Sequence, residues 1–230
     1  MRLRSLAIPA ALAVAATVGV PAAGSAAVPG CHLAGPTKVV VDSTSEKVTW
    51  GFGPDCMDVT NGGGATATWA LTDPSGDPVT TIGLDIPTPD EHEYSHTFAD
   101  TAPKGWYTAT GTGITPSWLT QNAPVLDVKY ASRISVPGSR NGSDKLTLSA
   151  HVTQWSGAAH DYVGRRNTPV ALQFKPRGST TWTYVKAART SSAAKVTISV
   201  MSPKAGSYRL KVAETNTVWA AYSQAVVVVD

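Results

Sequence analysis

His92, Glu93 and His96 match a catalytic signature in both residue type and spacing. In the pattern H-E-x-x-H, two histidines on one face of a helix bind zinc, and the glutamate acts as base toward a zinc-bound water. Pro89 and Pro103 leave little room for a helix, and the side chains between them alternate as in a strand. In a strand the two histidines are about 13 Å apart, too far to share one zinc. A secreted zinc hydrolase is therefore only an alternative function, and we expect no metal or other cofactor.

Acidic pairs and other histidines give weaker indications of chemistry. Asp55 with Asp58, and Asp73 with Asp77, could hold calcium between loops, but turn formation explains both pairs equally well. No G-x-S-x-G motif is present, so a serine nucleophile of the hydrolase type has no support. The other histidines are scattered and form no triad that the sequence reveals: His32, His151 and His160. Because no catalytic set is convincing, we expect a protein that is not an enzyme.

Aromatic and basic side chains supply the candidate binding residues. Trp118, Trp155 and Trp219 are expected in loops or at strand ends, where exposed rings can stack on sugars. The alternative is that these rings pack under loops or at a junction between domains. Arg165 and Arg166 are neighbours in a basic half of the chain and are candidates for contact with an anionic surface.

The first 27 residues are typical of a secretory signal peptide. Arg2 and Arg4 provide a positive start, a short apolar stretch follows, and the small residues 24–27 form a cleavage site. The apolar stretch is too short for a membrane-spanning helix. We expect cleavage after Ala27, with Ala26 as the alternative, and therefore a secreted or extracellular protein with no membrane insertion after processing.

Cys31 and Cys56 are the two cysteines of the sequence. In an oxidising compartment an even pair is usually a disulfide, and no C-x-x-C spacing indicates a redox site. Closing this loop would contribute on the order of 3 kcal/mol of stability. We predict that the bond ties the first mature residues to the body of the domain.

Alternation of apolar and polar residues recurs along the chain and predicts strands. In the first half the expected strands cover residues 37–42, 47–52, 65–72, 78–84, 93–98, 106–111 and 124–130. In the second half they cover residues 131–136, 145–154, 168–176, 181–188, 195–201, 207–213 and 224–229. Seven strands per half is the number that an immunoglobulin-like sandwich needs, with Trp69 as its core tryptophan in the first half. An up-and-down barrel is the rival architecture.

A repeated corner favours the sandwich. Pro103-Lys104-Gly105 precedes Tyr107, and Pro203-Lys204-Ala205-Gly206 precedes Tyr208 about a hundred residues later. In immunoglobulin-like sandwiches a tyrosine at this place bonds through its hydroxyl to the backbone of the corner. The predicted fold is therefore all-β, with two tandem immunoglobulin-like β-sandwich domains after the signal peptide.

Charge divides the chain at the same place as the repeat. Residues 28–128 hold three basic and twelve acidic residues, a formal charge of −9, and residues 129–230 hold fourteen basic and four acidic residues, a charge of +10. We therefore predict an acidic domain over residues 28–128 and a basic domain over residues 129–230. The basic half could dock on an anionic cell-wall polymer, the halves could attract each other, or the charges could simply solvate two surfaces. No nucleic acid is expected, because the basic residues form no helix face or RNP-type strand.

Sequence segments of the second half resemble the bacterial immunoglobulin-like domains of secreted actinobacterial proteins. The resemblance covers most of residues 168–212 and includes Val170-Ala171-Leu172-Gln173-Phe174, Lys175-Pro176-Arg177-Gly178, Thr181-Trp182-Thr183-Tyr184-Val185 and Gly206-Ser207-Tyr208-Arg209. It implies an extracellular or surface module, usually without catalysis, and it transfers no binding residues. We expect a secreted, non-enzymatic binding, adhesion or structural module whose partner is an anionic wall polymer, a polysaccharide or another protein. A carbohydrate-binding module that uses exposed tryptophans is an alternative.

Overall fold

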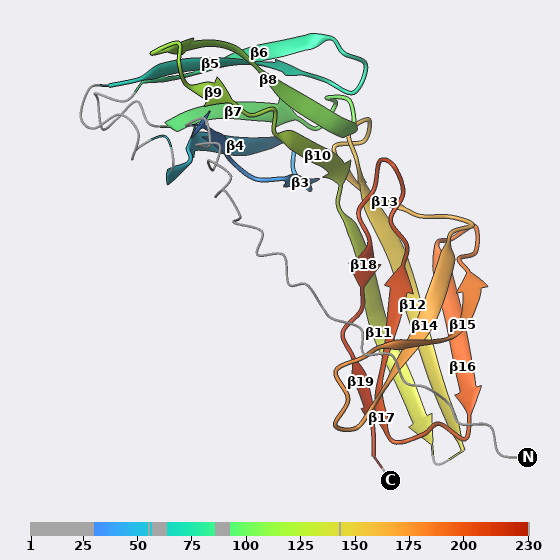
Figure 1. Ribbon diagram of the computed structural model, residues 1–230. Helices are drawn as coiled ribbons and strands as arrows, with labels where there is room; N and C mark the ends of the chain where they lie inside the picture. Colours follow the sequence, from blue (N-terminus) through green and yellow to red (C-terminus); the bar gives the residue numbers. More distant parts are fainter. Residues whose placement is uncertain (1–29, 55, 57–63, 86–92, 143, 230) are drawn as a thin grey trace, which may run out of the picture.

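The computed structural model describes residues 30–54, 56, 64–85, 93–142 and 144–229, and the strands that they form make the fold all-β. Figure 1 shows two groups of sheets set at an angle, joined where one long path of chain passes from β10 into β11. Each group encloses a hydrophobic cluster of its own. We call these groups the first half and the second half.

The first half contains two facing sheets and a short additional pair of strands. The five-stranded sheet has the order β3-β10-β8-β5-β6, the three-stranded sheet has the order β2-β4-β7, and β1 pairs with β9. The strands are β1 (Gly30–Cys31), β2 (Leu33–Ala34), β3 (Lys38–Val41), β4 (Ser45–Phe52), β5 (Thr66–Thr72), β6 (Pro78–Asp85), β7 (Glu93–Ala99), β8 (Gly105–Thr115), β9 (Thr120–Gln121) and β10 (Val125–Tyr130).

The second half repeats the plan of two facing sheets. One sheet contains β11, β12 and β16, with β13 beside one end of β12, and the other has the order β15-β14-β17-β18, with β19 also on β17. The strands are β11 (Ser132–Gly142), β12 (Lys145–Ser156), β13 (Asp161–Gly164), β14 (Pro169–Pro176), β15 (Thr183–Arg189), β16 (Lys195–Met201), β17 (Gly206–Val212), β18 (Ala221–Tyr222) and β19 (Val226–Val228).

Both halves follow the two-sheet plan of an immunoglobulin-like sandwich, with one difference. In the second half β11, β12 and β16 form one sheet, and β14, β15, β17 and β19 belong to the other. In the first half β4 and β7 share a sheet with β2, whereas β3 joins the other sheet by pairing in parallel with β10. Alternation produces this layering, because β17 buries Tyr208, Leu210 and Val212 while the residues between them face outward. The predicted strand pattern is therefore confirmed, although the sequence did not indicate the short strands β1, β2, β9, β13 and β18, and β8 and β11 extend beyond their expected ends.

The two tyrosine corners have matching geometry. The Tyr107 hydroxyl donates a hydrogen bond to the carbonyl oxygen of Pro103 at 2.7 Å, and the Tyr208 hydroxyl donates to that of Lys204 at 3.1 Å. Gly206 has a φ of 146°, and a Cβ there would clash with the carbonyl oxygen of Lys175. Glycine is therefore needed where the corner passes close to β14.

Further contacts fix the first half. Trp69 is fully buried and its indole N–H donates to the carbonyl oxygen of Asn122 at 3.1 Å, which confirms it as a core residue. The predicted disulfide between Cys31 and Cys56 is present and both cysteines are buried. Among the described residues, none forms a helix with the length and apolar character needed to span a membrane.

Candidate binding surface

The segment with the zinc-protease spacing lies in a strand. Glu93–Ala99 forms β7, and His96 pairs with Val48 on β4. The His96 ring meets the Phe98 ring edge-on at 4.8 Å, and burial lowers the pKa of this histidine. His92 lies outside the described residues. Within the part of the chain that the structure describes, no three His, Cys, Asp or Glu side chains gather closely enough to hold a metal ion.

Of the two acidic pairs, Asp73 and Asp77 belong to a turn. The Asp73 carboxylate accepts hydrogen bonds from the backbone N–H groups of Ser75 at 2.8 Å and Asp77 at 3.0 Å. This is the local bonding by which an aspartate stabilises a turn. The other acidic pair, Asp55 and Asp58, lies outside the described residues.

The three candidate tryptophans have different environments. Trp118 is 52% exposed, whereas Trp155 is only 8% exposed and packs with the core of the first half. Trp219 is partly buried, and its indole N–H donates to the carbonyl oxygen of Val39 at 2.8 Å. Trp155 and Trp219 therefore lie between the halves, as the alternative interpretation of these residues had it, and the buried Trp155 ring has no face free for a sugar.

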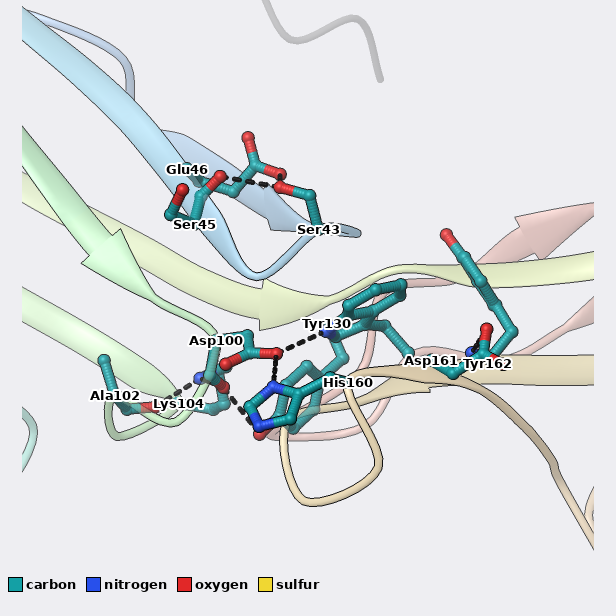
Figure 2. Close-up of polar contacts among 11 residues, drawn as sticks. Ser43, Ser45, Glu46, Asp100, Ala102, Lys104, Tyr130, His160, Asp161 and Tyr162 are labelled. Carbon is teal, nitrogen blue, oxygen red and sulfur yellow. Dashed lines mark hydrogen bonds and ion pairs between the residues drawn. The ribbon is translucent and has the colours of Figure 1, made fainter.

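We call the contact region between the two halves the junction, and Asp100 lies at the centre of one side of it (Figure 2). Its buried carboxylate accepts hydrogen bonds from the Trp155 indole at 3.2 Å and from His160 at 2.7 Å. Its backbone carbonyl accepts from the Tyr130 hydroxyl at 3.0 Å and from the Lys104 ammonium at 2.9 Å. Burial raises the pKa of Asp100, but the hydrogen bonds that its carboxylate accepts from His160 and Trp155, together with the charges of His160 and Lys104, outweigh this effect, so the net shift is downward.

Lys129 is the centre of the other side of the junction. Its ammonium contacts Asp127 at 2.6 Å and Glu214 at 2.5 Å, and it lies 4.6 Å from the centre of the Trp219 ring. Burial lowers the pKa of Lys129, but the two carboxylates outweigh this effect and raise it overall. Backbone bonds add to the contact, because the Tyr130 N–H donates to the Thr217 carbonyl and the Trp219 N–H donates to the Tyr130 carbonyl, both at 2.9 Å.

The two neighbouring arginines do not act together. Arg165 is buried, its guanidinium donates to the Ser132 hydroxyl at 3.3 Å, and burial lowers its pKa. Arg166 is exposed. The structure therefore leaves only Arg166 of this pair accessible to an anionic surface.

A different set of side chains gathers on the outer face of the second half. Gln173 and Lys175 project from β14, and Arg209 and Lys211 project from β17, because the residues between them face the core. The aromatic members of the set are exposed or partly buried. We call this surface the basic aromatic face, and it consists of Gln173, Lys175, Trp182, Tyr184, Arg209, Lys211 and Tyr222.

Arg209 is held at the centre of the basic aromatic face. The carbon at the centre of its guanidinium lies 4.1 Å from the centre of the Trp182 ring and 4.2 Å from that of Tyr222. Its Nε donates to the Gln173 side-chain oxygen at 2.9 Å. Within the described residues, the two terminal nitrogens of Arg209 have no hydrogen-bond partner. A guanidinium fixed in this way presents a planar pair of donors, which suits the two oxygens of a carboxylate.

Two lysines flank Arg209. The Lys175 ammonium lies 5.2 Å from the centre of the Trp182 ring, and that of Lys211 lies 5.6 Å from that of Tyr222. Between residues 169 and 229 the sequence has one acidic residue, Glu214, whose carboxylate pairs with Lys129 at the junction. The cations of the basic aromatic face therefore lack a carboxylate partner from this stretch of chain.

Part of the basic aromatic face is visible in the sequence. Alternation makes Tyr208, Leu210 and Val212 the inward set of β17, which leaves Arg209 and Lys211 facing outward. Trp182 and Tyr184 are two residues apart, the spacing that places side chains on one face of a strand. The neighbours of Arg209 depend on cross-strand register, because Gln173 pairs with both Arg209 and Tyr184. A bulge between Leu172 and Gln173 sets that register, and alternation alone does not reveal a bulge.

Comparison with known proteins gives distant likenesses among solved structures. No family model matches the chain, and no curated protein matches it. A mutant form of Salmonella alpha-2-macroglobulin is similar with a TM-score of 0.40 and 10% identity, over 85% of this chain and 14% of that chain. The BSP domain of a biofilm associated protein has a TM-score of 0.29 and 12% identity, over 86% and 29%. The calcium binding domain CBD12 of CALX1.1 has a TM-score of 0.31 and 10% identity, over 78% of each chain. The chain spans a small part of the first two proteins, and likenesses of this size carry no argument about its activity.

Proposed function

We propose that this chain is a secreted, non-catalytic binding module that attaches to an anionic polymer at the outside of the cell. Residues 1–27 act as the signal peptide, and residues 28–128 and 129–230 are two immunoglobulin-like domains. The first domain serves as a support, and the second presents the binding surface.

The observation that carries this proposal is the basic aromatic face. It lies on an open sheet, its cations have no carboxylate partner from residues 169–229, and Trp182 and Tyr222 hold Arg209 in place. The disulfide supports secretion, because such bonds persist in oxidising compartments. The junction supports a stiff arrangement of the domains, because it combines buried aromatic packing with hydrogen bonds to Asp100.

Neither alternative function has comparable support. A zinc hydrolase needs His92 and His96 on a helix, and His96 lies in a strand. A sugar-binding site built from Trp118, Trp155 and Trp219 has little support, because only Trp118 of the three has a well-exposed ring. A third interpretation is that the acidic and basic halves attract each other. Within one molecule this attraction is supported only by individual ion pairs, such as Arg133 with Asp42 at 3.3 Å.

The proposal is tested by expressing the full chain in a secreting bacterium and locating the product. We expect an exported protein that begins at Val28 and adheres to isolated cell walls. Because the contact is electrostatic, we expect adhesion to fall when salt rises from about 0.05 M to about 0.5 M. Walls stripped of anionic polymer should bind less protein. Retention in the cytoplasm with residues 1–27 intact, or equal binding to stripped walls, would contradict the proposal.

A further inference from the structure

We propose that the basic aromatic face binds a carboxylate-bearing polysaccharide and that Arg209 forms the hydrogen bonds to a carboxylate group of this polymer. This inference rests on the proposed function and names its ligand class. The spacing of the cations, the role of the rings and the balance of charge each support it.

The cations form a ladder along β17. Lys175 lies beside Ser207, Gln173 lies beside Arg209, and Lys211 lies two residues further along the strand. Successive levels are therefore two residues apart, or about 7 Å at the rise of a strand. A linear polymer with regularly spaced negative charges can contact such a ladder at several points, and each added contact raises the total affinity.

The rings of Trp182 and Tyr222 serve to position cations. Trp182 has Lys175 and Arg209 over its ring, and Tyr222 has Arg209 and Lys211. Such contacts contribute about 0.5–1 kcal/mol each at exposed sites and restrict the motion of long side chains. Arg209 is therefore arranged before the ligand arrives, which reduces the entropy lost on binding.

The same arrangement favours an acidic polysaccharide over a nucleic acid. Single-stranded nucleic acids bind through bases stacked on free aromatic rings, and cations already contact two of the three rings here. Tyr184, with 67% of its surface exposed, remains free to pack against the apolar face of a sugar. The terminal nitrogens of Arg209 match a carboxylate in planar geometry, and a neutral polysaccharide offers no such group.

The experiment measures binding of the mature full chain to polygalacturonate by calorimetry, with dextran as the neutral polymer and single-stranded DNA as the competing polyanion. Arg209→Ala should weaken polygalacturonate binding about tenfold or more, because it removes a charge-assisted pair. Arg209→Lys should restore only part of the affinity, because lysine keeps the charge but loses the planar pair of donors. Lys195→Ala, on the opposite sheet, removes the same charge and should change affinity less than about twofold.

The possible outcomes test the role of Arg209, the class of ligand and the proposed function separately. Equal losses in Arg209→Ala and Lys195→Ala, or full recovery in Arg209→Lys, would overturn the role of Arg209. Equal binding of dextran, or tighter binding of DNA, would overturn the ligand class. If polygalacturonate does not bind while isolated walls still do, this inference fails and the proposed function stands. Melting temperatures of the variants within about 2 °C of the parent show that each still folds.

Discussion

The two halves of the molecule differ in where most of their aromatic side chains gather, although the first half also exposes Trp106 (58%) and Trp118 (52%). The first half buries Trp50, Trp69, Phe98 and Tyr107 in one cluster. The core of the second half is mainly aliphatic, with Tyr208 as its buried aromatic residue, and its outer sheet displays Trp182, Tyr184 and Tyr222. Rings in a core stabilise the fold through buried area, whereas rings on an open sheet are available for contact. The comparison indicates a support in the first half and a binding surface in the second.

The halves also close their sheets differently. In the first half β3 pairs in parallel with β10, so an early strand of this half lies beside its last strand. In the second half β11 stays with β12, and a cleft of about 810 Å³ lies between residues 132–136 and 220–226. The disulfide belongs to the first half alone. Because the first half has a covalent cross-link and a larger aromatic core, we expect it to be the stiffer of the two halves.

Replacing a buried ring and an outward ring is the strongest way to test this comparison. Trp69→Ala should cost about 3–5 kcal/mol, because it removes a fully buried side chain and leaves a cavity. Trp182→Ala should change stability by less than about 1 kcal/mol and should weaken polymer binding. Urea denaturation and the binding assay measure both quantities. Similar stability losses in the two variants would remove the distinction between the halves.

Removing the disulfide should have the next largest effect. The Cys31→Ser and Cys56→Ser double variant frees a loop whose ends are 25 residues apart in sequence, and we expect a loss of about 3 kcal/mol. Hydrogen exchange should rise in β4, β5 and β8 and stay unchanged in β14 and β17. Equal increases in both halves would show that the halves do not unfold separately.

Gly157 provides a test of the junction. A Cβ at this position would overlap the carbonyl oxygen of Asp100, so Gly157→Ala must push the halves apart. We expect a loss of about 1–3 kcal/mol and faster proteolysis near residues 130–132. Gly83→Ala is the control, because a Cβ there meets nothing within 4 Å. Matching proteolysis rates in these two variants would contradict the close approach at Gly157.

Alkaline pH should reveal the smallest effect, on the order of 1 kcal/mol after solvent screening. Burial lowers the pKa of Lys104 from 10.5 to about 8 and outweighs the opposing charge of Asp100. Between about pH 8 and 10.5 the unfolded chain therefore binds more protons than the folded chain, and the free energy of unfolding should rise with pH. Burial and Asp73 raise the pKa of Tyr107 from 10.0 to about 12, so the folded chain holds its proton longer and stability should fall above pH 10. Denaturation from pH 7 to 11 should therefore show a maximum near pH 10. Lys104→Met should remove the rise, and an unchanged rise in that variant would contradict its assignment.

The sequence predicted local features well and relations between distant strands poorly. Alternation and corner residues predicted the strands, because burial of every second side chain is a local pattern. The disulfide followed from a single possible pairing of cysteines. The surroundings of Trp155, Arg165 and Arg209 could not be predicted in this way, because each depends on a partner 30 or more residues away, such as Asp100, Ser132 or Gln173. The junction and the basic aromatic face arise from register and packing between sheets, which single-strand patterns do not contain.

The division between a supporting half and a binding half is tested most directly by backbone NMR during titration with polygalacturonate. We predict that amide shifts concentrate in β14, β15, β17 and β18 and that they saturate together. The amides of β4, β5 and β8 should stay within experimental error. Shifts centred on the first half or on the junction around Asp100 would contradict the account.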